Sequence, residues 1–154
     1  MIKIRKAKKE DIKEIDKIYS EGCIDEGKYQ FHNITKKEMK KDLERKSSKR
    51  KRDFKEKLKK RKQYWLIAEI NNKIIGFGQV WFKDKEVGKI QKIYIDRKFR
   101  RKGIGEKICK ELIKWLKKNK IKHIEAGFYW KNKPSIEMHK KLGFRPISLI
   151  MRLK

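Results

Sequence analysis

The stretch IYIDRKFRRKGIGE at residues 93–106 decides the fold class, because it predicts a strand that leads through a basic turn into a helix. Isoleucine alternates with other residues before the turn, and the apolar residues after it recur at helical spacing. Gly103 and Gly105 let the backbone approach a ligand closely, and the unbonded N–H groups at a helix start attract anions. Cations at residues 100–102 add formal positive charge at the same place. The stretch therefore predicts a binding site for a phosphate or a pyrophosphate.

On both sides of this turn, hydrophobic periodicity predicts a series of strands and helices. The expected strands lie near residues 2–4 and at 64–70, 74–82, 87–95, 121–129 and 144–153. The expected helices lie around residues 12–19, within 36–62, over 104–119 and at 134–142, with a loop rich in glycine and acids at 22–27. The order β-α-α-β-β-β-α-β-α-β predicts a single α/β (α+β) domain over residues 1–154, with a mainly antiparallel, mixed sheet flanked by helices.

The second unusual property is positive charge. The 154 residues contain 48 Lys and Arg against 20 Asp and Glu, a formal net charge of +28. Residues 36–62 hold 16 of these cations and five acids, a net of +11. Thr35 and Glu38 form a capping box, so this segment is expected to be one long helix or two, with Ser47-Ser48 as the break. Its cationic face favours a nucleic acid or ribosome as partner, whereas compositional bias or adaptation to heat explains the total charge equally well.

Several classes of protein are excluded by composition. No apolar run approaches the roughly 20 residues that cross a bilayer, and the N-terminus lacks an apolar stretch of signal-peptide length. We therefore expect a cytoplasmic protein with no membrane contact. Cys23 and Cys109 are isolated and the three histidines are scattered, so neither a disulfide scaffold nor a metal site is expected.

The glycine turn resembles a family signature. Residues 100–105 match the R/Q-x-x-G-x-G/A pattern of the GNAT superfamily of acyl-CoA-dependent N-acetyltransferases, and Ile-Tyr-Ile resembles the strand before that pattern. The resemblance implies that acetyl-CoA is the co-substrate and that the segment Arg100, Arg101, Lys102, Gly103, Ile104, Gly105 and Glu106 holds its pyrophosphate. It also implies that main-chain groups of Ile93, Tyr94 and Ile95, where the family's strand carries a bulge, pair with the pantetheine arm.

A second match lies at residues 132–144, NKPSIEMHKKLGF, which resembles the family pattern N-x-x-[AS]-x-x-x-[YH]-x-x-x-G-F. The resemblance implies that Asn132 and Ser135 belong to the cofactor site and that His139 lies near the thioester sulfur, where it is our candidate general acid. Met-His followed by Leu-Gly-Phe resembles the branch that acetylates phosphinothricin and other small amino acids.

Acetyl transfer also needs a base, since a free alkyl amine with a pKa of about 10 is mostly protonated at neutral pH. Family members often carry a Glu at the start of the strand that here reads KIQK at residues 89–92, and no carboxylate stands there. The substitutes are Glu125 on the next strand, Asp25 or Glu26 in the acidic loop, and Glu86 at a turn. A main-chain N–H of the strand at 93–95 is the expected oxyanion donor.

The leading hypothesis is therefore an acetyl-CoA-dependent N-acetyltransferase. The acceptor is the primary amine of a small, amino-acid-like molecule, or that of a protein N-terminus or lysine. Polyamines are disfavoured, because the net positive charge repels them. The alternative is a basic protein that binds nucleic acid or the ribosome through residues 36–62. The sequence leaves open whether the protein is a homodimer.

Overall fold

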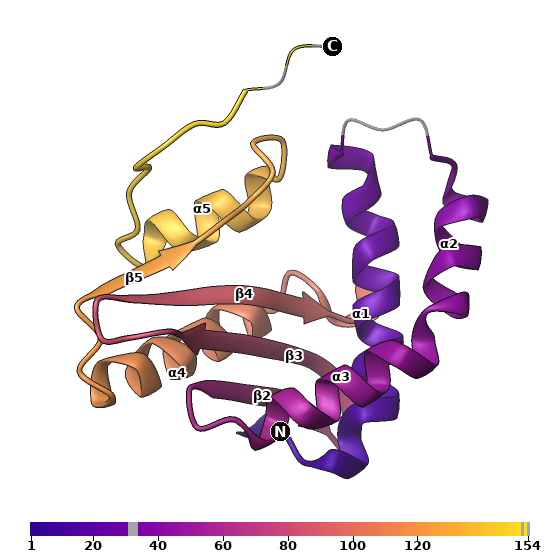
Figure 1. The fold of residues 1–154 in the computed structure, drawn as a ribbon, viewed down its shortest axis with the longest axis horizontal. Helices are drawn as coiled ribbons and strands as arrows, with labels where there is room; N and C mark the ends of the chain where they lie inside the picture. Colours follow the sequence, from indigo (N-terminus) through magenta and orange to yellow (C-terminus); the bar gives the residue numbers. More distant parts are fainter. Residues whose placement is uncertain (31–33, 152, 154) are drawn as a thin grey trace.

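The computed structural model describes residues 1–30, 34–151 and 153, and His32 lies outside them. One mixed sheet of five strands, in the order β1-β2-β3-β4-β5, organises the fold (Figure 1). The strands are β1 Lys3–Lys6, β2 Gln63–Ile70, β3 Lys73–Phe82, β4 Val87–Ile95 and β5 His123–Ala126. The first four pair antiparallel, and β5 pairs with β4 in parallel. The predicted α/β class with a mainly antiparallel, mixed sheet is confirmed.

Five α-helices flank this sheet in the described chain: α1 Ile12–Glu26, α2 Lys36–Arg45, α3 Ser47–Lys59, α4 Ile104–Lys118 and α5 Lys133–Lys141. The basic segment is thus two helices, with the break at Lys46 beside the predicted serine pair. Thr35 and Glu38 form the predicted capping box at the start of α2. Figure 1 shows α1, α2 and α3 grouped at one end of the sheet and α5 beside β5 at the other.

Two apolar clusters cover the two faces of the sheet. Successive side chains of a strand point to opposite faces, and in β2 they divide accordingly. Leu66 and Ala68 pack in a cluster with α4, whereas Trp65 and Ile67 pack in a cluster with α1 and Phe54 of α3. The helices α1 and α4 therefore lie on opposite faces.

Strand β4 changes phase in its middle. Gln79 of β3 pairs with Lys92 and the next residue, Val80, pairs with Ile90, so Gln91 is an extra residue, a β-bulge. Before it Ile90 packs in the α4 cluster, and after it Ile93 and Ile95 do so. The bulge therefore lies two residues before the Ile93–Ile95 segment where we predicted it.

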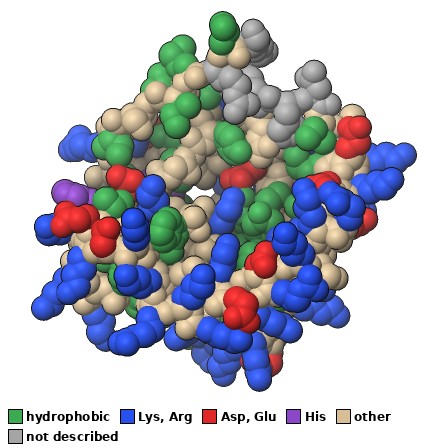
Figure 2. All heavy atoms as spheres, viewed as in Figure 1, with side chains coloured by type: hydrophobic (Ala, Val, Ile, Leu, Met, Phe, Trp, Pro, Cys, Tyr) green, Lys and Arg blue, Asp and Glu red, His purple; other side chains and the backbone are tan. Residues whose placement is uncertain are grey.

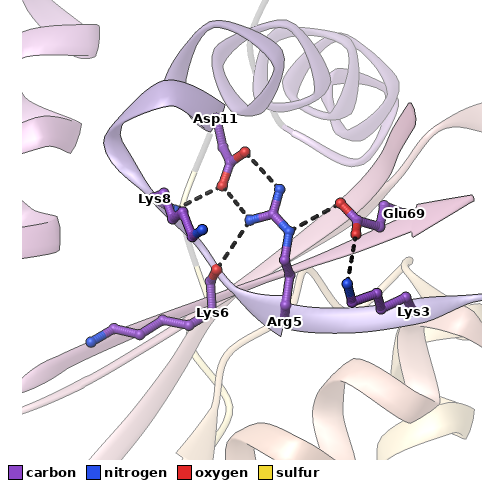
Figure 3. A network of polar contacts seen from close by, with 6 residues as sticks. All are labelled: Lys3, Arg5, Lys6, Lys8, Asp11 and Glu69. Carbon is purple, nitrogen blue, oxygen red and sulfur yellow. Dashed lines mark hydrogen bonds and ion pairs between the residues drawn. The ribbon is translucent and has the colours of Figure 1, made fainter. Parts of the chain in front are cut away.

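A partly buried ionic network fixes β1 to its neighbours (Figure 3). The guanidinium of Arg5 donates two hydrogen bonds to Asp11, at 2.8 and 2.9 Å, and one to Glu69 on β2, at 3.0 Å. Burial alone would raise the pKa of Asp11, but hydrogen bonds from Arg5 and from the Lys8 backbone outweigh it, and the pKa is lowered. The Asp11 carboxylate therefore stays ionised beside the Arg5 guanidinium.

The predicted loop at residues 22–27 is wrong, because α1 continues through Glu26. Glycine normally weakens a helix, but Gly22 is required here. A Cβ atom at this position would lie 2.4 Å from the Tyr94 ring. The glycine thus permits close approach of α1 to β4, and it places Asp25 and Glu26 on the last turn of the helix.

The predicted last strand at 144–153 is also wrong: within residues 144–151 and 153 the chain forms no strand. This segment rises beyond α5 and away from the sheet (Figure 1), and Ile147, Leu149 and Ile150 are 78%, 73% and 93% exposed. A strand requires a hydrogen-bonding partner as well as an alternating pattern, and only the pattern is present. The predicted strand at 121–129 is likewise shortened to His123–Ala126.

Candidate active site

The basic turn has the geometry of an anion site. Gly103 is the N-cap of α4 and has a left-handed backbone, φ +71°, and Arg101 is left-handed too, at φ +64°. No side chain of the described residues caps the helix, so the N–H groups of its first turn remain available, and the positive end of the helix dipole lies there. A Cβ atom on Gly103 would meet nothing within 4 Å, so the space in front of the turn is open. These features fit a pyrophosphate.

Arg100 holds this turn against the rest of the fold. Its Nε atom donates to the Ile95 carbonyl at 2.8 Å, and its guanidinium pairs with Asp25 at 2.6 Å. Arg97 also pairs with Asp25. Burial alone would raise the pKa of Asp25, but hydrogen bonds from the two arginines outweigh it and lower the pKa. Asp25 therefore joins the end of α1 to the basic turn and is fully engaged there.

Strands β4 and β5 diverge in front of this turn. Their pairing ends at Ile90 and Ala126, so the segment 91–95 has no strand partner on its β5 side among the described residues. The Asp96 N–H donates to the Ile75 carbonyl, and backbone direction alternates along a strand, so Ile93 and Ile95 direct their polar groups away from β3. The opening between the strands is therefore lined by main-chain donors and acceptors that an extended ligand can use.

Figure 2 shows a hollow in the middle of one face, which by comparison with Figure 1 lies over β4, between α5 and α1. Tyr94 of β4 points to the α1 side and donates its hydroxyl to Glu26 Oε2 at 2.5 Å. Burial raises the pKa of Tyr94, so the phenol stays protonated. Lys92 Nζ lies 3.5 Å from the same hydroxyl. Tyr94 thus contributes a side chain to the acidic end of α1, besides the main-chain role that we predicted for its segment.

His139 is buried and only 3% exposed. Its Nδ1 lies 2.9 Å from the Ser135 carbonyl, which can only accept, so Nδ1 carries the proton and Nε2 accepts from Cys109 at 3.6 Å. Phe128 and Phe144 pack on the ring at centroid distances of 4.4 and 5.1 Å. Burial lowers the pKa of His139. This is the environment of a neutral packing residue, and it does not favour the predicted role of general acid.

The remaining predicted residues lie around these groups. Asn132 is buried and caps α5, accepting from the Ser135 N–H at 3.4 Å. Glu125 pairs with Lys89 across the paired part of β4 and β5, at 3.9 Å, and Glu86 pairs with Lys122 at 2.5 Å. Of the four candidate bases, only Glu26 contacts Tyr94. The structure therefore brings Asp25 and Glu26 to the divergence of the strands and leaves Glu125 and Glu86 in ion pairs elsewhere.

Comparison with known proteins gives the family. A profile described as the Acetyltransferase (GNAT) family matches residues 28–144. The chain belongs to the GNAT family. The structure is similar to that of the PaiA N-acetyltransferase of Thermoplasma acidophilum in complex with coenzyme A, with a TM-score of 0.81 and 19% identity, covering 94% of this chain and 90% of that one. It is also similar to the structure of a predicted acetyltransferase of Clostridium acetobutylicum with acetyl-CoA, with a TM-score of 0.73 and 27% identity, covering 100% of this chain and 96% of that one.

Among curated proteins, an uncharacterised N-acetyltransferase of Methanocaldococcus jannaschii is 32% identical over 97 residues. These residues are 59% of this chain and 43% of that protein, so the chain spans less than half the length of this relative.

Sequence reasoning missed three features of this GNAT site. The Tyr94–Glu26 hydrogen bond, the Arg100–Asp25–Arg97 cluster and the Cys109–His139 contact each join residues that are 30 or more positions apart. In the sequence, only the adjacent acids Asp25 and Glu26 pointed to these contacts. Because this segment was predicted as a loop, the directions of their side chains on a helix could not be inferred.

Proposed function

We propose that this GNAT protein transfers an acetyl group from acetyl-CoA to the primary amine of an acceptor. The observation that carries the proposal is the uncapped start of α4 beside the divergence of β4 and β5, because together they offer an anion site and an open strand edge. Coenzyme A combines a pyrophosphate with an extended, amide-containing arm, and two similar structures contain coenzyme A or acetyl-CoA.

The residues present fit such a co-substrate. The first-turn N–H groups of α4, with Arg101 and Lys102 exposed beside them, would hold the pyrophosphate. Main-chain groups of Ile93 and the Ile95 N–H would bond the arm, and the buried Asn132 and the half-buried Ser135 shape the α5 side of the opening. Acetyl-CoA would supply a thioester, whose carbonyl is open to attack by an amine. A strand N–H aimed at that carbonyl would stabilise the negative charge that develops on its oxygen.

Glu26 is our candidate for the general base. It receives the Tyr94 hydroxyl on Oε2, while Oε1 has no hydrogen-bond partner among the described residues. A carboxylate with one free oxygen, fixed by a buried tyrosine, can take a proton from an ammonium group directly or through one water. The His139 environment supplies no comparable free group, so we assign proton transfer at the acceptor amine to Glu26.

The charges near Glu26 favour an acceptor of the amino-acid type. Lys92 lies beside Tyr94, so a cation and a carboxylate are both within reach of one hydroxyl. An amino acid carries the complementary pair, an amine for Glu26 and a carboxylate for Lys92. A protein N-terminus or a lysine presents the amine without this carboxylate, and is the second class of acceptor.

The test is an acetyl-transfer assay that follows release of the free coenzyme A thiol. We expect transfer to at least one amine in a panel of amino acids, N-terminal peptides and polyamines, with amino acids preferred. Glu26→Gln should lower kcat by about 100-fold, because general-base catalysis contributes roughly that much, and should leave acetyl-CoA affinity unchanged. Glu21→Gln, which removes an exposed acid from the same helix, is the matched control and should behave as the wild type. If no amine of the panel is acetylated, the proposed activity is wrong. If Glu26→Gln keeps the kcat of the wild type, Glu26 is not the general base.

A further inference from the structure

Helix α3 is held rigidly against α1, and this fixes where its outer cations lie. Arg50 Nε and Ser47 Oγ each donate to the Asp16 carboxylate of α1 at 2.6 Å. Phe54 is buried, with its ring 5.0 Å from that of Trp65 and 5.5 Å from that of Tyr19. The inner face of α3 is therefore committed to the fold, and the rest of the helix faces solvent.

A groove of about 390 Å³ lies between the start of α1 and α3. Its walls carry one carboxylate, Glu10, and the five cations Lys9, Lys13, Lys51, Arg52 and Lys55. Only Lys9 pairs with the acid, at 3.9 Å and with both side chains exposed, so this pair is weak. The other four cations have no acidic partner in the described part of the chain. They converge on one groove from two helices.

This arrangement differs from that of the other basic helices. On α2, Asp42 pairs with Arg45 and Lys46 at 2.6 Å. On α4, Glu106 and Glu111 pair with lysines one turn away, at 2.6 Å each. Positive charge is thus spread over the face that Figure 2 shows, but in the groove four cations that lack an acidic partner among the described residues share a concave site with a single acid, Glu10. General compositional bias predicts the spread and does not predict this concentration.

We propose that the groove between α1 and α3 binds the sugar–phosphate backbone of double-stranded DNA. Clustered cations repel one another, and a polyanion with closely spaced phosphates relieves that repulsion and releases its own counterions. No aromatic residue is among those that line the groove, so it lacks the stacking platforms on which single strands bind. Apart from Ser48, every polar side chain of the lining is charged and all but Glu10 are cations, which suits contacts to the phosphates of a duplex backbone.

The groove and the acetyl-transfer site lie at opposite ends of α1. Lys13 and Glu26 are separated by 13 residues of one helix, which at 1.5 Å per residue is about 20 Å. The two sites are therefore separate, and the inference is independent of the proposed acetyl transfer.

The experiment measures anisotropy of a labelled 20-base-pair DNA duplex with the whole protein over a salt series. The triple variant Lys51→Gln/Arg52→Gln/Lys55→Gln should weaken binding at least 10-fold at about 0.1 M salt. It should also flatten the slope of log affinity against log salt by about two to three, because each lost phosphate contact contributes about 0.9. The control Lys117→Gln/Lys118→Gln/Lys120→Gln removes three exposed cations at the end of α4, and should change affinity less than threefold.

The proposal fails if the wild type does not bind at 0.1 M salt, or if the two triple variants weaken binding equally, because binding would then reflect total charge. Tighter binding of a single strand or of duplex RNA than of duplex DNA also overturns it. The thermal midpoint of each variant, measured in parallel, should match that of the wild type. If the groove variant is less stable than the wild type, the double variant Arg52→Gln/Lys55→Gln takes its place, because both of these side chains are exposed. The expected loss of DNA affinity is then smaller, and it must still exceed that of the α4 control.

Discussion

Gly22 shows how a single residue determines the candidate site. It lies inside α1, where glycine costs up to about 1 kcal/mol relative to alanine. Its missing side chain lets the Tyr94 ring occupy that space, and the approach brings the Tyr94 hydroxyl to Glu26. In the sequence, the same glycine beside acids indicates a loop. Local propensity was misleading here because a contact between distant segments determines the conformation.

His139 can be tested by pH, because burial lowers its pKa. The folded protein resists protonation of this ring, whereas the unfolded chain takes up a proton below pH of about 6.5. The free energy of unfolding should therefore be highest above pH 6.5 and fall as the pH decreases, by at most about 1.4 kcal/mol per pH unit for this group. His139→Leu should lack this part of the dependence, and should keep kcat within about threefold.

Denaturant unfolding between pH 7.5 and 5 measures this effect, and His123→Leu, which replaces an exposed histidine, is the control that should keep the full dependence. An unchanged pH dependence in His139→Leu would contradict the buried, neutral ring. A 100-fold loss of kcat at unchanged acetyl-CoA affinity would restore His139 as a general acid.

At the scale of elements, sequence periodicity was reliable where elements carry their own pattern. The strand pairs β2–β3 and β3–β4, the helix α4 and the break in the basic segment were all predicted, because each depends on alternation, helical spacing or a capping residue. The bulge at Gln91 was placed two residues too late, since pairing register depends on the neighbouring strand. The last strand failed for a related reason: alternation indicates a strand but does not supply a partner.

The segment after α5 gives a direct test of that correction. Leu149 is 73% exposed, so Leu149→Ala should change the thermal midpoint by less than about 2 °C, as surface substitutions do. Leu112 is fully buried in the α4 cluster, and the same change there should cost about 2–5 kcal/mol, a fall of roughly 4–20 °C in the thermal midpoint. Differential scanning fluorimetry measures both. A comparable loss in Leu149→Ala would show that residues 144–151 pack as the predicted strand.

At the scale of the whole molecule, the net charge of +28 divides into parts with different roles. Arg100 joins the basic turn to α1, Arg101 and Lys102 lie beside the open start of α4, and four unpaired cations share the groove of α1 and α3. Several of the others form short-range pairs with acids on their own helices. The glycine turn predicted the cations beside the start of α4. The basic segment predicted that further cations would lie on the helices that form the groove. The sequence did not predict which cations remain unpaired, because that depends on contacts between helices.

The central claim is that the start of α4 holds the pyrophosphate of acetyl-CoA, and calorimetric titration of acetyl-CoA tests it directly. The wild type should bind one molecule per chain. Gly103→Glu should weaken binding at least 100-fold, because it places a negative charge in the anion site. Gly103→Ala carries the same backbone strain at φ +71° without the charge, and its Cβ meets nothing within 4 Å, so it should stay within about 10-fold of the wild type. Failure of the wild type to bind, or equal affinity of Gly103→Glu, would contradict the account.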